Sequence, residues 1–121
     1  MRLDSKGTIR SPVLKTKLMD RTVAADFLAR HGGSDFIGAA TNSQGEHIAV
    51  YDGRDGAIYT MASRPHASDR VWMEIIPRDF GLPRWELIRD GLLTFEFREE
   101  DQILYRLTPR GELEAERLQA N

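Results

Sequence analysis

The stretch "GLLTFEFREEDQILYRLTPRGEL", from Gly91 to Leu113, sets the expected architecture of this 121-residue chain. Apolar side chains alternate with polar ones on both sides of a charged tip, at Leu93, Phe95, Phe97, Ile103, Tyr105 and Leu107. A period of two is that of a half-buried strand, so the stretch predicts a β-hairpin. Thr108 is placed to cap a following helix, with Pro109 as its first residue.

A first helix is predicted over "DRTVAADFLARHGG", residues 20–33. Asp20 is positioned to cap this helix, and the glycine pair at 32–33 to end it. The expected inward face consists of Val23, Ala24, Phe27 and Leu28. The next stretch, "SDFIGAATNSQGE", is expected to form a short helix from Ser34 and then a loop.

Strand periodicity appears in "EHIAVYDGRDGAIYTMAS", residues 46–63, whose central Asp and Gly residues favour a tight reversal. This segment predicts a second hairpin. "VWMEII", residues 71–76, fits a strand face or a helix face, and its β-branched and aromatic content favours a third strand. "LPRWELIRDG" predicts a short helix with Pro83 in its first turn and Gly91 just past its end.

Taken together, these segments predict an α+β fold in a single small domain. The expected order is helix, a β-hairpin of two strands or of three with 71–76, short helix, wing-like β-hairpin and C-terminal helix. The domain is expected to span residues 20–121, after a basic and partly flexible arm over residues 1–19. Residues 1–21 hold six basic residues against two acidic ones, although the whole chain has a net charge of −2.

Composition argues against several classes of function. Cysteine is absent, which removes disulfides and thiolate chemistry, and the three histidines are widely spaced, so neither a metal nor a cofactor is expected. "HGGSDF" places His31, Ser34 and Asp35 close together, but a helix end followed by a cap explains this pattern better than a catalytic triad. The chain is therefore expected not to be an enzyme. No apolar run is long enough to span a bilayer, so a cytoplasmic protein without membrane contact is expected.

The closing third of the chain resembles the C-terminal half of winged-helix DNA-binding domains of the MarR and PadR kind. The resemblance covers about residues 84–118. Its matching residues are Asp90, Gly91, Leu92, Leu93, Tyr105, Leu107, Thr108, Pro109 and Gly111. It implies a recognition helix before Gly91, a wing over the hairpin, and a last helix that builds a homodimer.

Charge at the hairpin tip does not fit a wing that touches DNA. The tip places Glu99, Glu100 and Asp101 next to the single Arg98, and three carboxylates repel a phosphate backbone. The expected recognition helix between Gly81 and Gly91 is also short for reading a major groove, at about two turns.

Two hypotheses follow, and a third is more distant. The first is a DNA-associated transcriptional regulator on double-stranded DNA, with phosphate contacts from Arg78, Arg84, Arg89, Lys6, Arg10, Lys15 and Lys17. The alternative is a protein-interaction module, an adaptor or inhibitor, whose Glu99, Glu100 and Asp101 bind a basic partner without any DNA. The third is a small enzyme or ligand-binding protein with a pocket between the 47–61 hairpin and the terminal unit.

Overall fold

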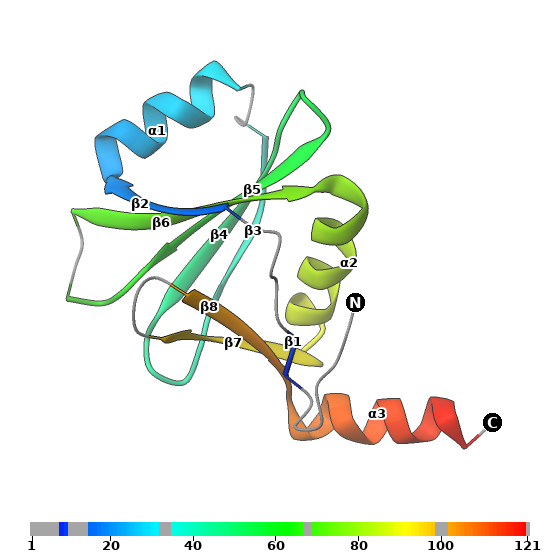
Figure 1. Ribbon diagram of the computed structural model, residues 1–121. Coiled ribbons are helices and arrows are strands. Elements are labelled where there is room, and N and C mark those ends of the chain that lie inside the picture. The colour runs from blue at the N-terminus through cyan, green and yellow to red at the C-terminus, as the bar shows by residue number, and fades with distance from the viewer. Residues whose placement is uncertain (1–7, 10–14, 32–34, 67–68, 99–101, 121) are drawn as a thin grey trace.

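The computed structural model describes residues 8–9, 15–31, 35–66, 69–98 and 102–120. Over these residues the fold is α+β, as predicted, with two antiparallel sheets and three helices (Figure 1). The elements are β1 (Thr8–Ile9), β2 (Lys15–Asp20), α1 (Arg21–Arg30), β3 (Asp35–Thr41), β4 (His47–Asp52), β5 (Ala57–Ser63), β6 (Arg70–Pro77), α2 (Arg78–Arg89), β7 (Leu93–Arg98), β8 (Gln102–Leu107) and α3 (Pro109–Gln119).

The larger sheet has five strands in the order β2-β6-β5-β4-β3. The predicted hairpin over 46–63 is confirmed as β4 and β5, which reverse near Gly56 with its φ of +83°. The ambiguous segment 71–76 lies in β6, so it is a strand, as its composition favoured. Both neighbours of β6 are antiparallel to it, and β2 pairs with it along its whole length from Lys15 to Asp20.

Period-two alternation gives the five-stranded sheet two apolar faces. One face packs against α1, where Ala24 and Leu28 contact Tyr59, Val71 and Met73. The opposite face, called here the inner face, is covered by α2 and by the β7–β8 hairpin, so the molecule has three layers (Figure 1). Its buried side chains are Ile48, Val50, Ile58, Thr60, Ala62, Trp72, Glu74 and Ile76.

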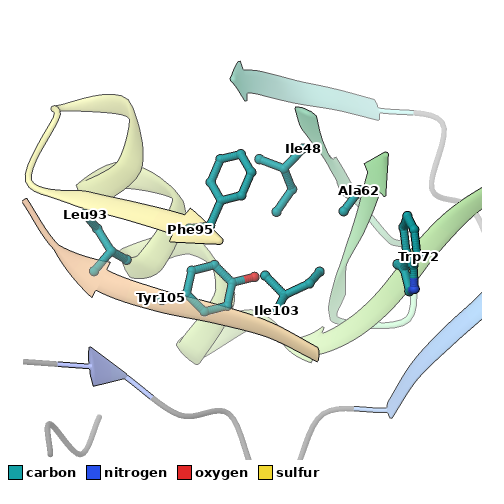
Figure 2. Close-up of a cluster of buried hydrophobic side chains, with 7 residues drawn as sticks. All are labelled: Ile48, Ala62, Trp72, Leu93, Phe95, Ile103 and Tyr105. Atoms are coloured by element: carbon teal, nitrogen blue, oxygen red, sulfur yellow. The ribbon is translucent and has the colours of Figure 1, made fainter. Parts of the chain in front are cut away.

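The main core cluster joins the β7–β8 hairpin to the inner face. Leu93, Phe95, Ile103 and Tyr105 of the hairpin pack against Ile48, Ala62 and Trp72 of the large sheet (Figure 2). Burying each of the larger apolar side chains stabilises the fold by roughly 1.5–3 kcal/mol. The hairpin predicted from "GLLTFEFREEDQILYRL" is therefore confirmed, and its apolar face is part of the core.

The helix before this hairpin is longer than predicted. α2 begins directly after β6 and runs for 12 residues, or about three turns, through both Gly81 and Pro83. Gly81 does not end a helix here, because it lies against the sheet: a Cβ at this position would come within 2.8 Å of Ile58 Cβ. The helix predicted over "LPRWELIRDG" is therefore confirmed, but its expected start near Pro83 was wrong, since Gly81 serves close packing inside the helix.

The predicted short helix after Ser34 was also wrong. Residues 35–41 form the edge strand β3, which pairs with β4. Gly38 of this strand lies against Trp85, since a Cβ on Gly38 would fall 2.3 Å from Trp85 Cζ2. A register shift between Phe36 and Gly38 interrupts the alternation, which hides the strand from a period-two search.

Three details in the first part of the chain differ from expectation. Lys15–Asp20 is strand β2, so the last part of the predicted flexible arm belongs to the large sheet. Val23 was expected on the inward face of α1, but it is 54% exposed, because Ala24 and Leu28 take the buried side. Asp20 does precede α1, although its side chain makes no capping hydrogen bond.

The predicted junction between β8 and α3 is confirmed. The Thr108 hydroxyl accepts a hydrogen bond from the Gly111 amide at 3.0 Å and donates one to the Gly91 carbonyl at 2.7 Å. Gly91 has φ +77°, the left-handed conformation expected just past a helix end. Thr108 therefore ties the end of α2 to the start of α3.

Candidate functional site

A cluster of buried polar side chains lies in the middle of the inner face. Glu74 on β6 is 1% exposed, and Thr60, directly opposite it on β5, is 4% exposed. The Tyr105 hydroxyl donates to Glu74 Oε1 at 2.6 Å, and Thr60 Oγ1 donates to the same oxygen at 3.4 Å. The Tyr105–Glu74 bond links β8 of the small sheet to β6 of the large sheet.

Arg84 of α2 completes this cluster. Its guanidinium carbon lies 4.5 Å from the centre of the Tyr105 ring, a cation–π contact, and its side chain is buried. Burial raises the pKa of the Glu74 carboxyl, which the Tyr105 hydroxyl and the charge of Arg84 oppose. Burial also raises the pKa of Tyr105 well above its ordinary value, and the Glu74 charge adds to this.

The cavity beside this cluster is too small for a substrate. Its volume is about 10 Å³, close to that of a single water site, and its lining includes Ile48, Val50 and Tyr105. It lies between the 47–61 hairpin and the terminal unit, where a ligand pocket was considered from the sequence. A pocket for a metabolite needs several hundred Å³. The cluster is therefore suited to holding the two sheets together.

An open hollow of about 300 Å³ lies at the start of α2. Asp35 and Asp52 are opposite each other on β3 and β4 at its rim, and Arg78 binds both carboxylate oxygens of Asp52 at 2.6 and 2.8 Å. All of these groups face solvent, where an ion pair contributes about 0–1 kcal/mol. Within the described ranges no three acidic or histidine side chains gather to hold a metal.

The basic residues predicted to contact DNA do not form one surface. Arg78 is paired with Asp52, and Arg89 contacts Asp90 at 3.2 Å. Arg84 is 6% exposed beneath α2, so its guanidinium is not available to a phosphate on the surface. The prediction for Arg84 was wrong because the spacing of charges along a helix does not reveal which turn faces the core.

The remaining predicted residues lie elsewhere. Lys15 and Lys17 are on β2, at the opposite edge of the large sheet from β3, and Lys17 is exposed. Lys6 and Arg10 lie outside the described residues, and so do Glu99, Glu100 and Asp101 of the hairpin tip.

Sequence reasoning missed how the outer edge of β7 is covered. In the three-stranded sheet β7 pairs with β8 on one side only. On its other side the Asn42 amide donates to the Phe95 carbonyl at 3.0 Å, and Glu46 Oε1 accepts from the Phe97 amide at 3.3 Å. Both side chains come from the β3–β4 turn. No local pattern near Asn42 indicates a contact with a strand some fifty residues away.

Sequence reasoning also missed Glu74, although a signal was present. It is the one charged residue in the apolar run 71–76, and it was not singled out. A carboxyl in the middle of a buried strand requires hydrogen-bond partners, which Tyr105 and Thr60 supply. Such a position marks the chain's buried polar cluster without showing which residues complete it.

The C-terminal helix presents the most exposed apolar side chains of the described surface. Leu113 and Leu118 of α3 are 67% and 64% exposed. Gly111 anchors the first turn, where a Cβ would come within 2.0 Å of the Leu92 carbonyl oxygen. Beyond that turn α3 extends away from the two sheets (Figure 1). This projecting helix, together with the hairpin that carries it, is the candidate interaction site.

Comparisons with known proteins identify no family: no family model, no curated protein and no solved structure matches the chain. No helix in the described ranges is both long and apolar enough to cross a membrane.

Proposed function

We propose that this chain is a non-enzymatic protein-interaction module that binds its partner through β7, β8 and α3. The observation that carries the proposal is the position of α3, which is fixed to the body at Gly111 and exposes Leu113 and Leu118 beyond it. An isolated helix shorter than about 12–15 residues is marginal in water, and most helices in proteins are stabilised by packing. A partner that covers this 11-residue helix would supply the missing packing.

The arrangement of the two leucines indicates what kind of partner fits. They are five residues apart, so at about 100° per residue they point to different sides of the helix. A partner that contacts both must surround the helix, as a groove does, and helix-in-groove binding uses such anchors. Glu112 and Glu116 of the same helix are also exposed, which favours basic residues at the rim of that groove.

The hairpin tip extends the same acidic character. Its three carboxylates follow β7 directly in the chain, and together with α3 they give residues 96–116 seven acidic residues against three basic ones. A basic partner would gain association rate from this charge, with a strong dependence on salt concentration.

The test compares the wild-type chain with a Leu113→Ser/Leu118→Ser variant. The matched control is Val23→Ser, which changes a side chain exposed to a similar degree on α1. We expect the double variant to lose a partner captured from lysate by cross-linking, while it keeps the wild-type unfolding midpoint. Light scattering on purified protein shows whether the partner is a second copy of the chain. Equal capture by all three proteins would contradict the proposal.

The charge contribution has its own test. Reversal of Glu99, Glu100 and Asp101 to lysine should weaken capture at low salt and reduce its salt dependence. An unchanged salt dependence would limit the interface to the apolar residues of α3.

A second candidate is a winged-helix-like regulator that binds DNA. It is supported by the order α2, β7, β8, α3 and by the turn at Gly91, which are the parts on which the resemblance to winged-helix proteins rests. Arg78 and Arg89 would make the phosphate contacts, since both are partly exposed. Replacing both with alanine should then lower DNA affinity and reduce its salt slope. Absence of binding to duplex DNA at low salt would remove this candidate.

A further inference from the structure

The cavity between α2 and the inner face is the size of one water molecule. Its volume is about 10 Å³. A cavity of roughly this size can hold a single water. Most of the lining residues are apolar, and Thr60, Arg84 and Tyr105 are the lining residues with polar side-chain atoms.

Arg84 has two buried donor nitrogens that have no acceptor among the protein atoms. Its Nε and Nη1 have no hydrogen-bond partner, although the residue is only 6% exposed. The contact with the Tyr105 ring stabilises the positive charge but supplies no lone pair for these donors. A buried donor without a partner costs about 1–3 kcal/mol, and more when it carries charge. The side chain therefore requires an acceptor in the cavity.

The opposite wall of the cavity includes Thr60. Thr60 uses its hydroxyl hydrogen toward Glu74 Oε1, so the lone pairs of its oxygen remain able to accept. A molecule between the two walls must accept from the helix side and donate to the sheet side. Water does both.

We infer that this cavity binds one water molecule, which accepts a hydrogen bond from Arg84 and donates one to the Thr60 hydroxyl. The water connects α2 to β5 and extends the Thr60–Glu74 and Tyr105–Glu74 bonds into a network across four elements, α2, β5, β6 and β8. This inference does not depend on the proposed interaction function. A small anion is the competing occupant, but it cannot donate to Thr60 and would lie close to the Glu74 carboxyl.

Direct detection uses cross-peaks between water and methyl protons in NMR spectra. Ile76 and Ile88 line the cavity, so their methyl groups should show cross-peaks of the sign that marks a long-held water. The methyl groups of Val23, which is exposed, are the internal control. Thr60→Val removes the acceptor with little change in shape and should abolish the cross-peaks. Their absence in the wild-type protein would overturn the inference.

A stability measurement provides a second, independent test of the bound water. Val50 lines the cavity and is 2% exposed, so Val50→Ile adds a methyl group at the water site. Displacing the water leaves Arg84 unpaired and should lower the urea midpoint more than the matched Val71→Ile does on the face covered by α1. A midpoint that rises in Val50→Ile would show an empty apolar space and overturn the inference. An anomalous bromide peak in the cavity of a soaked crystal would also overturn it, in favour of an anion.

Discussion

Gly38 lies directly under the indole ring of Trp85, so close that a Cβ on residue 38 would come within 2.3 Å of Trp85 Cζ2. The contact joins the edge strand β3 to α2 and places the 6% exposed tryptophan against Val50 and Ile58. A methyl group added at this point has no room unless the ring moves, and the ring is fixed by the sheet beneath it.

Gly38→Ala should therefore lower the free energy of unfolding by about 1–3 kcal/mol, the usual cost of an overpacked core. Urea denaturation followed by tryptophan fluorescence measures this change. Ala39→Ser is the control, since residue 39 is exposed on the same strand and should stay within about 0.5 kcal/mol of wild type. Equal stability of the two variants would show that Trp85 does not rest on Gly38.

Glu74→Gln should change how stability depends on pH. Burial raises the pKa of Glu74 in the folded protein, so its contribution to stability is greatest below the pKa of the unfolded chain, about 4.3, and is lost as pH rises through the folded value. Glutamine keeps an oxygen for the Tyr105 hydroxyl and does not titrate. We expect the difference in urea midpoint, variant minus wild type, to increase as pH rises above about 4.3. Parallel curves would contradict a buried, titrating carboxyl.

Tyr59→Phe tests a second titration at alkaline pH. The Tyr59 hydroxyl donates to Asp55, and burial with this bond raises the pKa of Tyr59 to about 12. An unfolded tyrosine titrates near pH 10, so this stabilisation is complete below about pH 10 and is lost as pH rises toward the folded value. The variant should be less stable than wild type at pH 8 by about 1 kcal/mol. The gap should close as pH approaches 12, and a constant gap would show that Tyr59 does not titrate in this range.

Asn42→Ala should release the β3–β4 turn from β7. The Asn42 side chain donates to the Phe95 carbonyl and to Glu46 Oε1, and its own oxygen accepts from the Glu46 amide at 2.9 Å. Loss of these bonds should cost about 1–3 kcal/mol and raise amide exchange at Phe97, whose amide is bonded to Glu46. Gln44→Ala in the same turn is the control, because its exposed side chain should have little effect. Unchanged exchange at Phe97 would contradict this role for Asn42.

Segments with clean periodicity were predictable from the sequence. The alternation in β4, β5, β7 and β8 reflects strands with one face in the core, and Thr108 with Pro109 indicated the start of α3 from local chemistry alone. β3 was not predictable in this way, because the small residue Gly38 is required by its contact with Trp85, far along the chain. The same applies to α2, where Gly81 follows from contact with Ile58.

The candidate site was less predictable than the fold. Whether Arg84 faces solvent or the core depends on which turn of α2 meets the sheet, and its spacing from Arg78 and Arg89 does not contain that information. The exposed leucines of α3 became visible only once the helix was seen to extend past the body. The negative charge of the hairpin tip could be predicted directly, since it depends only on which residue types are present there.

The two side chains that cover β7 have a consequence for solubility. An open strand edge is a template on which another chain can add, and repetition of that step leads to fibres. Here the Phe95 carbonyl and the Phe97 amide are already bonded to Asn42 and Glu46, so a foreign backbone would first have to displace a neutral amide and a carboxylate. The β3–β4 turn therefore blocks the addition of a strand from another molecule at this edge of β7, and so prevents fibre growth from it.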